Sequence, residues 1–278
     1  MDLNFKNVAR YFSEIVTREE LYVNVDLRNA KSADTFSIAY SICLVNSEIR
    51  ALREQIDQKN EKNSSKRSEE AKWGVEVDYS QFFGSDDRLE EILYPSPSGF
   101  EFDKTYRIPA SSDIDLITDT ILESIINNKI NVDIPGIHEH VPEILHNAKV
   151  HPIEPFYFLR CHISEIERYF DIVIADIGLG IKGTLSKKAE YSYLEEKPSM
   201  HSIIKAFEPM VTSRNEPRGT GLSEAHDYFI EHTESTMFLS SNDGYYLIEH
   251  ENGNEVITAG NLRYNLNGVQ ILLRFGCE

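Results

Sequence analysis

The apolar run Asp171-Ile-Val-Ile-Ala-Asp-Ile177 constrains the fold of this chain more than any other segment. A short stretch of this kind, rich in β-branched residues, is typical of a strand inside a sheet. It is followed at once by Gly178 and Gly180, which allow the backbone to turn sharply and to approach a ligand closely. The pattern predicts an α/β fold with a strand that ends in a glycine turn at Asp176, although such turns are also common without a ligand.

Two amphipathic helices and a further strand are expected before this run. Ser112-Asp-Ile-Asp115 has the composition of a helix start, and apolar residues follow from Ile114 to Ile125 at spacings of three and four. A second helix is predicted from about Gly136 to Val150, with one apolar stripe. The segment from Phe156 to Ile163 is predicted to form a strand. We therefore expect helices that pack on a sheet.

A smaller set of elements is expected in the N-terminal part. Leu21 to Asp26 alternates apolar and polar residues as a half-buried strand does, and Ser32 to Val45 is predicted to form an apolar helix. Gly74 to Asp78 has the pattern of another short strand. Ile49 to Glu70 is almost purely polar and predicts a helix end that runs into a mobile insertion, around residues 52–73.

The length of 278 residues favours two domains. Turn-forming residues from Pro95 to Gly99 precede Tyr106-Arg-Ile-Pro109, so the boundary is expected near residue 108. The sequence predicts a small α/β domain at 1–108 and a larger α/β domain at 109–278.

The segment from Leu21 to Ser47 consists of a predicted strand, the loop Leu27-Arg-Asn-Ala-Lys-Ser-Ala-Asp34 and an apolar helix. It resembles the small α/β domain of sulfate transporters and anti-sigma-factor antagonists (STAS-like). In that family the loop carries a regulatory phosphorylated serine, and Ser32 is the nearest residue here. An unrelated α/β domain is an equally good interpretation.

The charge balance narrows the class of partner. Lys and Arg number 28 against 46 Asp and Glu, and the resulting net charge of −18 disfavours general nucleic-acid binding. Met1-Asp-Leu-Asn-Phe-Lys6 lacks the pattern of a secretory signal, and the most apolar stretch, Phe36 to Val45, is too short to cross a bilayer. With three widely spaced cysteines, these features predict a cytoplasmic protein with reduced thiols and no membrane segment.

Glu143 and Asn147 are the first candidates for chemistry. They are four residues apart, so on the second helix both side chains lie on one face, at the margin of the apolar stripe. A carboxylate beside an amide oxygen suits a hydrated Mg²⁺ ion that is shared with substrate phosphates. A solvated pair without a ligand is the alternative.

A further candidate motif is Arg218-Gly-Thr-Gly-Leu-Ser223, which leads into the helix-like segment from Glu224 to Ile230. Backbone N–H groups at a helix start lie at the positive end of the helix dipole and can bind phosphate. An ordinary helix cap is the alternative interpretation.

In this order, the motifs resemble the ATP-binding domain of the gyrase, heat-shock chaperone, histidine kinase and MutL superfamily. The residues that carry the resemblance are Glu143-Ile-Leu-His-Asn-Ala148, Asp176-Ile-Gly-Leu-Gly-Ile181 and Gly219-Thr-Gly-Leu222. Phe207 to Arg214 is similar to the segment of the histidine kinases that leads into the ATP lid. Asn265 to Phe275 is similar to the last strand of their sheet. Over roughly 109–278 the resemblance implies an α/β sandwich of the Bergerat type, in which a mixed sheet is covered by helices on one face.

The resemblance also implies a role for each matched residue. Asn147 would coordinate the Mg²⁺ bound to ATP, Glu143 would orient or deprotonate the attacking water, and Asp176 would accept a hydrogen bond from the adenine amine. The remaining positions would surround the nucleotide: Gly178, Gly180 and Ile181 on the adenine side, Gly219, Thr220, Gly221 and Leu222 at the phosphates, and Lys205, Arg214 and Arg218 as lid cations.

Two observations set limits on the resemblance. Ser223-Glu224 stand where the histidine kinases usually have a second glycine pair, so the phosphate loop is expected to differ there. No helical hairpin with a phosphorylatable histidine precedes the domain, which argues against an autophosphorylating histidine kinase.

Several histidines surround the second helix. They are His138, His140, His146, His151 and His162. A zinc site is one interpretation, but no zinc-binding motif joins these histidines and the cysteines offer no pair. His151, four residues after Asn147, is similar in position to a histidine of the bacterial anti-sigma kinases and could line the phosphate end.

The expected function is a Mg²⁺-dependent regulatory ATPase that signals through protein partners, including a second copy in a homodimer. ATP would close the lid and change the surface offered to the partner, and slow hydrolysis would reset it. One alternative is a protein serine kinase similar to the anti-sigma factors, in which Glu143 acts as a base toward serine. Another is a module that binds ATP without turnover.

Overall fold

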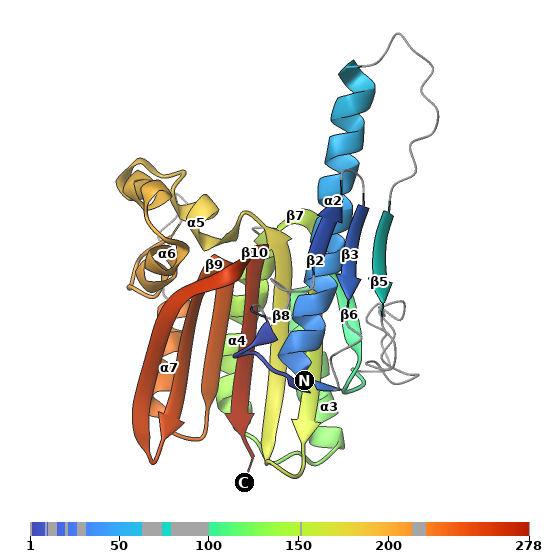
Figure 1. The fold of residues 1–278 in the computed structure, drawn as a ribbon. Coiled ribbons are helices and arrows are strands. Elements are labelled where there is room, and N and C mark those ends of the chain that lie inside the picture. Colours follow the sequence, from blue (N-terminus) through green and yellow to red (C-terminus); the bar gives the residue numbers. More distant parts are fainter. Residues whose placement is uncertain are drawn as a thin grey trace.

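The computed structural model describes residues 2–8, 10, 16–19, 22–26, 32–62, 74–78, 100–150, 152–212 and 221–277. Its centre is a five-stranded sheet with the strand order β6-β7-β8-β10-β9 (Figure 1). The strands are β6 Thr105–Pro109, β7 Pro152–Ser164, β8 Tyr169–Gly178, β9 Thr236–Glu251 and β10 Asn254–Gly276.

The predicted α/β class is confirmed, but the sheet is antiparallel in every described pairing rather than mixed. Two of the four pairings, β7–β8 and β9–β10, are hairpins, whose two strands must run in opposite directions. β8 is buried along almost its whole length, as the apolar run from Asp171 to Ile177 predicts. Helices cover both of its faces.

Three helices lie on one face of the sheet: α3 Ile114–Asn127, α4 Ile134–Val150 and α7 Gly221–Glu231 (Figure 1). The Asp113 carboxylate caps α3 by accepting a hydrogen bond from the Asp115 N–H at 3.0 Å. The apolar stripe predicted on α4 is buried against the sheet, as its periodicity indicates: Ile137, Val141, Ile144, Leu145 and Ala148.

The opposite face of the sheet is covered by α2, Thr35–Lys62, which comes from the N-terminal part of the chain, whereas the one-face arrangement is predicted for residues 109–278 alone. Phe36 packs edge-on against Phe238 of β9, with ring centroids 5.0 Å apart. Leu44 is fully buried in the same cluster as Val173 of β8. The hydrophobic core therefore joins residues from both sides of the expected boundary near residue 108, and the boundary itself stays a proposal.

The polar segment that follows Val45 is helical for longer than predicted, because α2 continues to Lys62 instead of ending before residue 52. Leu52 is only 3% exposed. Arg50 forms an ion pair with Glu54 one turn later at 2.8 Å, a contact that supports a polar helix. Two expectations lie outside the described residues, namely the insertion at 63–73 and the turn at 95–99.

Short N-terminal strands accompany α2. β2 Val16–Glu19, β3 Tyr22–Asp26 and β5 Gly74–Asp78 form a three-stranded sheet in which β3 and β5 are parallel. β1 Asp2–Leu3 pairs with β4 Ser32–Ala33. The strands predicted at 21–26 and 74–78 are thus confirmed.

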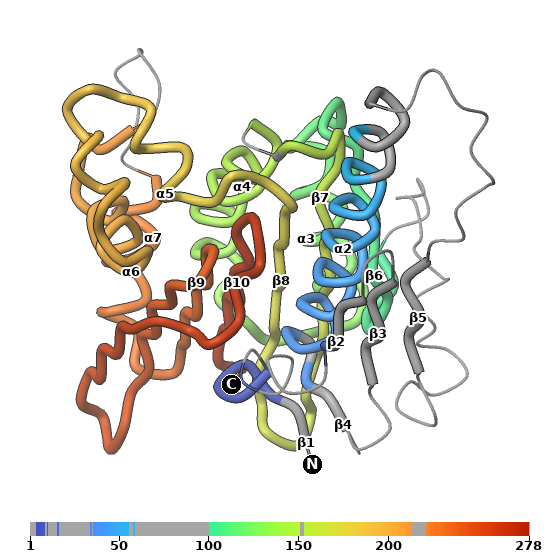
Figure 2. Tube along the Cα trace, turned by 45° about the horizontal axis from the view of Figure 1, so that its top comes forward, coloured from blue at the N-terminus to red at the C-terminus, as the bar shows by residue number. Residues whose placement is uncertain are grey.

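A group of short helices follows β8: α5 Gly180–Leu185, the 3-10 helix η1 Ala189–Glu196, and α6 Ser199–Ala206. Figure 2 shows α5 and α6 together on the side of the sheet away from α2. The Ser199 hydroxyl donates to the Asp243 carboxylate of β9. A Cβ on Gly244 would lie 2.6 Å from the backbone nitrogen of Met200, so α6 sits directly on the β9 backbone.

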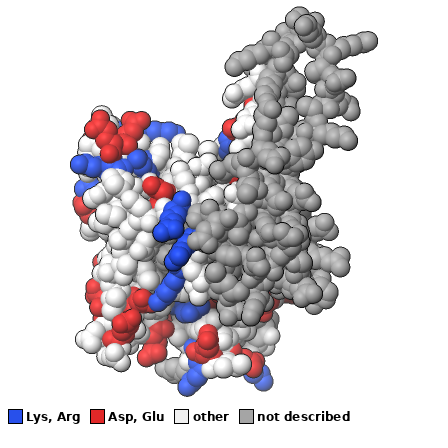
Figure 3. Space-filling model, viewed as in Figure 1, with Lys and Arg blue, Asp and Glu red and all other residues white. Residues whose placement is uncertain are grey.

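Among the described residues, no helix has both the length and the apolar composition that a membrane span requires. Figure 3 shows a narrow line of basic side chains along the middle of the visible face, with acidic side chains at several places around it.

Candidate functional site

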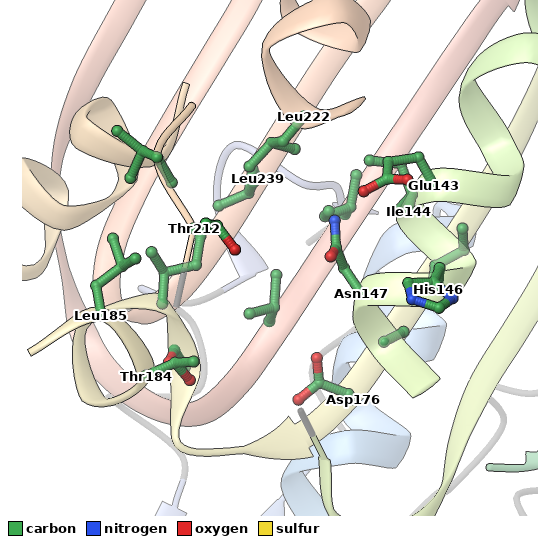
Figure 4. A pocket seen from close by; sticks show the side chains of 18 residues that line it. Glu143, Ile144, His146, Asn147, Asp176, Thr184, Leu185, Thr212, Leu222 and Leu239 are labelled. Atoms are coloured by element: carbon green, nitrogen blue, oxygen red, sulfur yellow. The ribbon is translucent and has the colours of Figure 1, made fainter. Parts of the chain in front are cut away.

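A cavity of about 140 Å³ lies at the end of β8, between α4, α5 and the start of α7. Figure 4 shows Glu143, His146 and Asn147 of α4 on one side, and Thr184 and Leu185 of α5 and Thr212 on the other. Six residues predicted for the site line this cavity together: Glu143, Asn147, Asp176, Gly180, Ile181 and Leu222.

Glu143 and Asn147 come from consecutive turns of α4 and are both partly exposed. Their neighbours Ile144 and Ala148 are buried against the sheet and fix the rotation of the helix. This rotation places the two polar side chains at the margin of the buried stripe, as their spacing predicts, and Figure 4 shows both beside the cavity. A carboxylate and an amide oxygen thus line one wall.

Asp176 is the buried acid of the site. Its side chain, at the end of β8, is 4% exposed and lines the cavity. Burial raises the pKa of this carboxyl group to about 7, and a hydrogen bond from the Val269 N–H works in the opposite direction. Within the described residues, the cavity lining contains Glu143 and Asp176 but no Lys or Arg.

The turn after Asp176 requires a glycine at residue 180. Gly180 has a φ of +71°, and a Cβ there would lie 2.0 Å from Asn242 Oδ1 of β9. The next N–H, that of Ile181, donates to the Ser241 hydroxyl at 2.8 Å. Gly178 pairs with Pro152 at the end of the β7–β8 ladder and is not one of the lining residues.

Helix α7 begins at Gly221, which lies directly against Glu143. Leu222 lines the cavity from the same first turn. The N-terminus of this eleven-residue helix, which is the positive end of its dipole, therefore lies next to Glu143.

Lys205 is the only predicted lid cation among the described residues, and it does not line the cavity. Lys205 forms an exposed ion pair with Glu208 at 2.5 Å and lies near the Tyr191 ring, so the structure does not bring it to the lining. The residues that follow Lys205 contribute Ala206, Val211 and Thr212 to the lining instead. Four predicted residues lie outside the described residues: Arg214, Arg218, Gly219 and Thr220.

Several lining residues escaped sequence reasoning. Thr184, whose hydroxyl donates to the Gly180 carbonyl at 2.7 Å, and Thr212 face the cavity from the side opposite Asn147. Apolar walls come from the middle of the sheet: Ile174, Leu239, Val269 and Ile271. Only their apolar character was visible in the sequence, because strand register decides which of them face the cavity.

The histidines do not form a common site. His140 is buried with its ring 4.7 Å from that of Tyr228, and burial lowers its pKa. His162 bonds Asp103 at 2.5 Å, whereas His146 lines the cavity. Among the described residues, no three His, Cys, Asp or Glu side chains group as metal ligands, and His151 lies outside that part of the chain.

No protein-family model and no curated protein sequence matches the chain. Among solved structures, the chain is similar to the mycobacterial sensor histidine kinase MprB, with 16% identity, a TM-score of 0.33, and coverage of 60% of this chain and 96% of that chain. It is also similar to the topoisomerase IV ATP-binding domain of Francisella tularensis in complex with a small-molecule inhibitor, with 13% identity, a TM-score of 0.28, and coverage of 63% and 42%. At these identities the similarity concerns the α/β fold alone.

Proposed function

We propose that the chain is a Mg²⁺-dependent ATP-binding protein that acts as a regulatory ATPase and signals through protein partners. One observation carries the proposal: α4, the end of β8 and the start of α7 bring Glu143, Asn147, Asp176 and Leu222 to a single cavity. These residues belong to three motifs that are far apart in the sequence.

The end of the cavity at Asp176 suits an adenine base. Its walls are mainly aliphatic, and flat apolar ligands gain free energy when they bury surface against such walls. Asp176 is a buried acceptor that adds one directional contact with an exocyclic amine. An apolar slot with a single buried acceptor favours adenine over guanine, because guanine has a carbonyl where adenine has its amine.

The end at Glu143 suits the phosphates with their metal ion. The N-terminus of α7 offers backbone donors at the positive end of a helix dipole. Asn147 would hold Mg²⁺ through its amide oxygen, with Glu143 beside it, and hard oxygen ligands of this kind fit the ion's preference. Because the described lining includes two carboxyl groups and no Lys or Arg, a polyphosphate needs the divalent ion to offset repulsion.

Glu143 is the residue proposed to orient or deprotonate the water that attacks the terminal phosphate. The N-terminal part, whose helix α2 packs behind β8, would report the state of the site to a partner protein or to a second copy in a homodimer. Two alternatives share this pocket, namely a protein serine kinase and a module that binds ATP without turnover. A regulatory ATPase releases inorganic phosphate, and a protein kinase transfers labelled phosphate to a protein. A module that only binds ATP does neither.

Thermal unfolding with a panel of ligands tests the proposed binding. ATP with Mg²⁺ and adenosine are expected to raise Tm, because a ligand that binds only the folded state stabilises it, whereas GTP raises it less. The Asn147→Ala variant should lose the contribution of Mg²⁺, and the control Glu139→Ala, exposed on the same helix, should keep it. A wild-type Tm that no nucleotide changes would contradict the proposal.

A further inference from the structure

β9 carries two adjacent serines, Ser240 and Ser241, and both are 1% exposed. The Ser240 hydroxyl donates to the Gln270 side-chain carbonyl at 2.9 Å, and the Gln270 amide donates to the Asp176 backbone carbonyl at 3.3 Å. Buried hydroxyl groups are normally hydrogen-bonded, and these two hydrogen bonds connect Ser240 to the end of β8.

Ser241 connects two backbone segments that line the cavity. Its oxygen accepts a hydrogen bond from the Ile181 N–H at 2.8 Å, in the turn that follows Asp176. Its proton is donated to the Gly268 carbonyl of β10 at 3.2 Å. A hydroxyl group has one proton and two lone pairs, so this single side chain can make both bonds at once.

Gly268 belongs to an irregular part of β10, where the pairing with β9 shifts register between Leu266 and Val269. Its φ is +107°, and a Cβ there would lie 2.1 Å from the Asp176 carbonyl oxygen. The following N–H, that of Val269, is the backbone donor to the Asp176 carboxyl group. The carbonyl held by Ser241 and the N–H that holds Asp176 thus belong to the same peptide unit.

We propose that Ser241 is a positioning residue for the nucleobase end of the pocket. By holding the peptide between Gly268 and Val269, it directs the Val269 N–H at Asp176 and so fixes the carboxyl orientation. By holding the Ile181 N–H, it also fixes the turn on the other side of the same carboxyl group. The inference rests on the proposed function, because the orientation of Asp176 matters for binding only if a nucleobase donates to it.

The chain offers a matched control in Ser124 of α3, which is 4% exposed. Its hydroxyl also makes two backbone bonds, since it accepts from the Phe100 N–H at 3.1 Å and donates to the Thr120 carbonyl at 2.9 Å. Ser124 is not one of the residues that line the cavity. Ser124→Ala therefore removes the same chemistry from a place without a role in binding.

In the ligand-free protein, Ser241→Ala is expected to speed hydrogen exchange of the Ile181 and Val269 amides by about tenfold, because the bonds that keep both segments closed are lost. Ser124→Ala should instead speed exchange at Phe100 and leave those two amides protected. Unchanged protection of Ile181 and Val269 in Ser241→Ala would overturn the inference.

In calorimetry, Ser241→Ala is expected to weaken adenosine and ATP by the same factor, about fivefold to tenfold, because the defect concerns the base and not the phosphates. Ser124→Ala should bind both ligands like the wild type. Ser241→Cys has a side chain of similar size that forms weaker hydrogen bonds, so its affinity for both ligands should lie between those of the wild type and Ser241→Ala. This variant replaces Ser241→Ala in the test if the alanine variant does not fold. If Ser241→Ala binds like Ser124→Ala, this inference alone falls, whereas a wild type that binds neither ligand overturns the proposed function and the inference together.

Discussion

Gly221, the first residue of α7, lies so close to Glu143 of α4 that a Cβ at position 221 would fall 1.8 Å from Glu143 Cγ. No side chain other than hydrogen fits this distance without displacing the carboxylate or the helix start. The glycine is therefore required by the approach of the two helices, and it brings the N-terminus of α7 close to the proposed catalytic acid.

Gly221→Ala is expected to lower ATP affinity and hydrolysis by about tenfold or more, because either Glu143 or the N-terminus of α7 must move. Alanine in a helix is otherwise favoured over glycine by about 1 kcal/mol, so intrinsic helix propensity does not explain a loss. A double-mutant cycle with Glu143→Ala, followed by urea unfolding and ATP binding, isolates the contact. In the Glu143→Ala background the effect should be much smaller, because only the 2.8 Å approach to the Cβ of residue 143 remains, and an undiminished effect there would contradict the steric explanation.

Asp176→Asn is expected to stabilise the protein at neutral and alkaline pH. The folded-state pKa of Asp176 is raised to about 7 from 3.8, so the folded state retains the proton while the unfolded state releases it. The stability of the wild type should fall as pH rises from about 4 to about 7, and a shift of roughly three units corresponds to about 4 kcal/mol. The Asp176→Asn variant, whose amide does not titrate, should not lose stability in this way.

Urea unfolding of both proteins at pH 5, 6, 7 and 8 measures this difference. The advantage of Asp176→Asn should grow up to about pH 7 and then remain constant. A constant difference across the whole range would show that Asp176 titrates in the folded protein as it does in the unfolded chain.

Leu44→Ala is expected to destabilise the whole protein by about 2 to 5 kcal/mol, because Leu44 of α2 is fully buried against the sheet. Since the core spans both sides of residue 108, urea unfolding should show one transition that shifts as a unit. Leu116→Ala, at a side chain that is 65% exposed, should change stability by less than about 0.5 kcal/mol. Two separate transitions, of which only one shifts, would support independent domains instead.

Glu143→Gln is expected to keep ATP binding and to slow hydrolysis by about 100-fold or more, because the amide cannot act as a base toward water. Release of inorganic phosphate at saturating ATP is the measurement, with Glu139→Gln on the exposed face of α4 as the control. Equal rates in wild type and Glu143→Gln would assign the chemistry to another residue.

The parts of the fold that follow a regular period could be predicted from the sequence. The apolar stripe of α4 and the run in β8 placed Glu143, Asn147 and Asp176 correctly relative to their elements, because local geometry determines which way a side chain faces. The full length of α2 could not be predicted in this way. Its second half is mostly polar, and Ile49, Leu52 and Ile56 at helical spacing are too few to fix where the helix ends. The burial of Leu52 and the ion pair between Arg50 and Glu54 show why it stays helical.

The residues that hold the site in place could not be predicted from the sequence either. Ser241 and Gly268 are a serine and a glycine in ordinary strand surroundings, and their importance comes from a register shift in β10 that brings them next to Asp176. Such contacts depend on tertiary pairing and not on local pattern. For the same reason, Lys205 was predicted at the phosphates from its position in the chain, whereas the fold pairs it with Glu208.

The central claim is that Asp176 is the nucleobase acceptor of an ATP site, and calorimetry of wild type and Asp176→Asn with ATP and Mg²⁺ at pH 8 tests it most directly. The wild type should bind ATP at one site, and the variant should bind about tenfold to 100-fold more weakly although it is the more stable protein, because a charge-assisted hydrogen bond is lost. A folded Asp176→Asn that binds ATP as tightly as the wild type would contradict the claim.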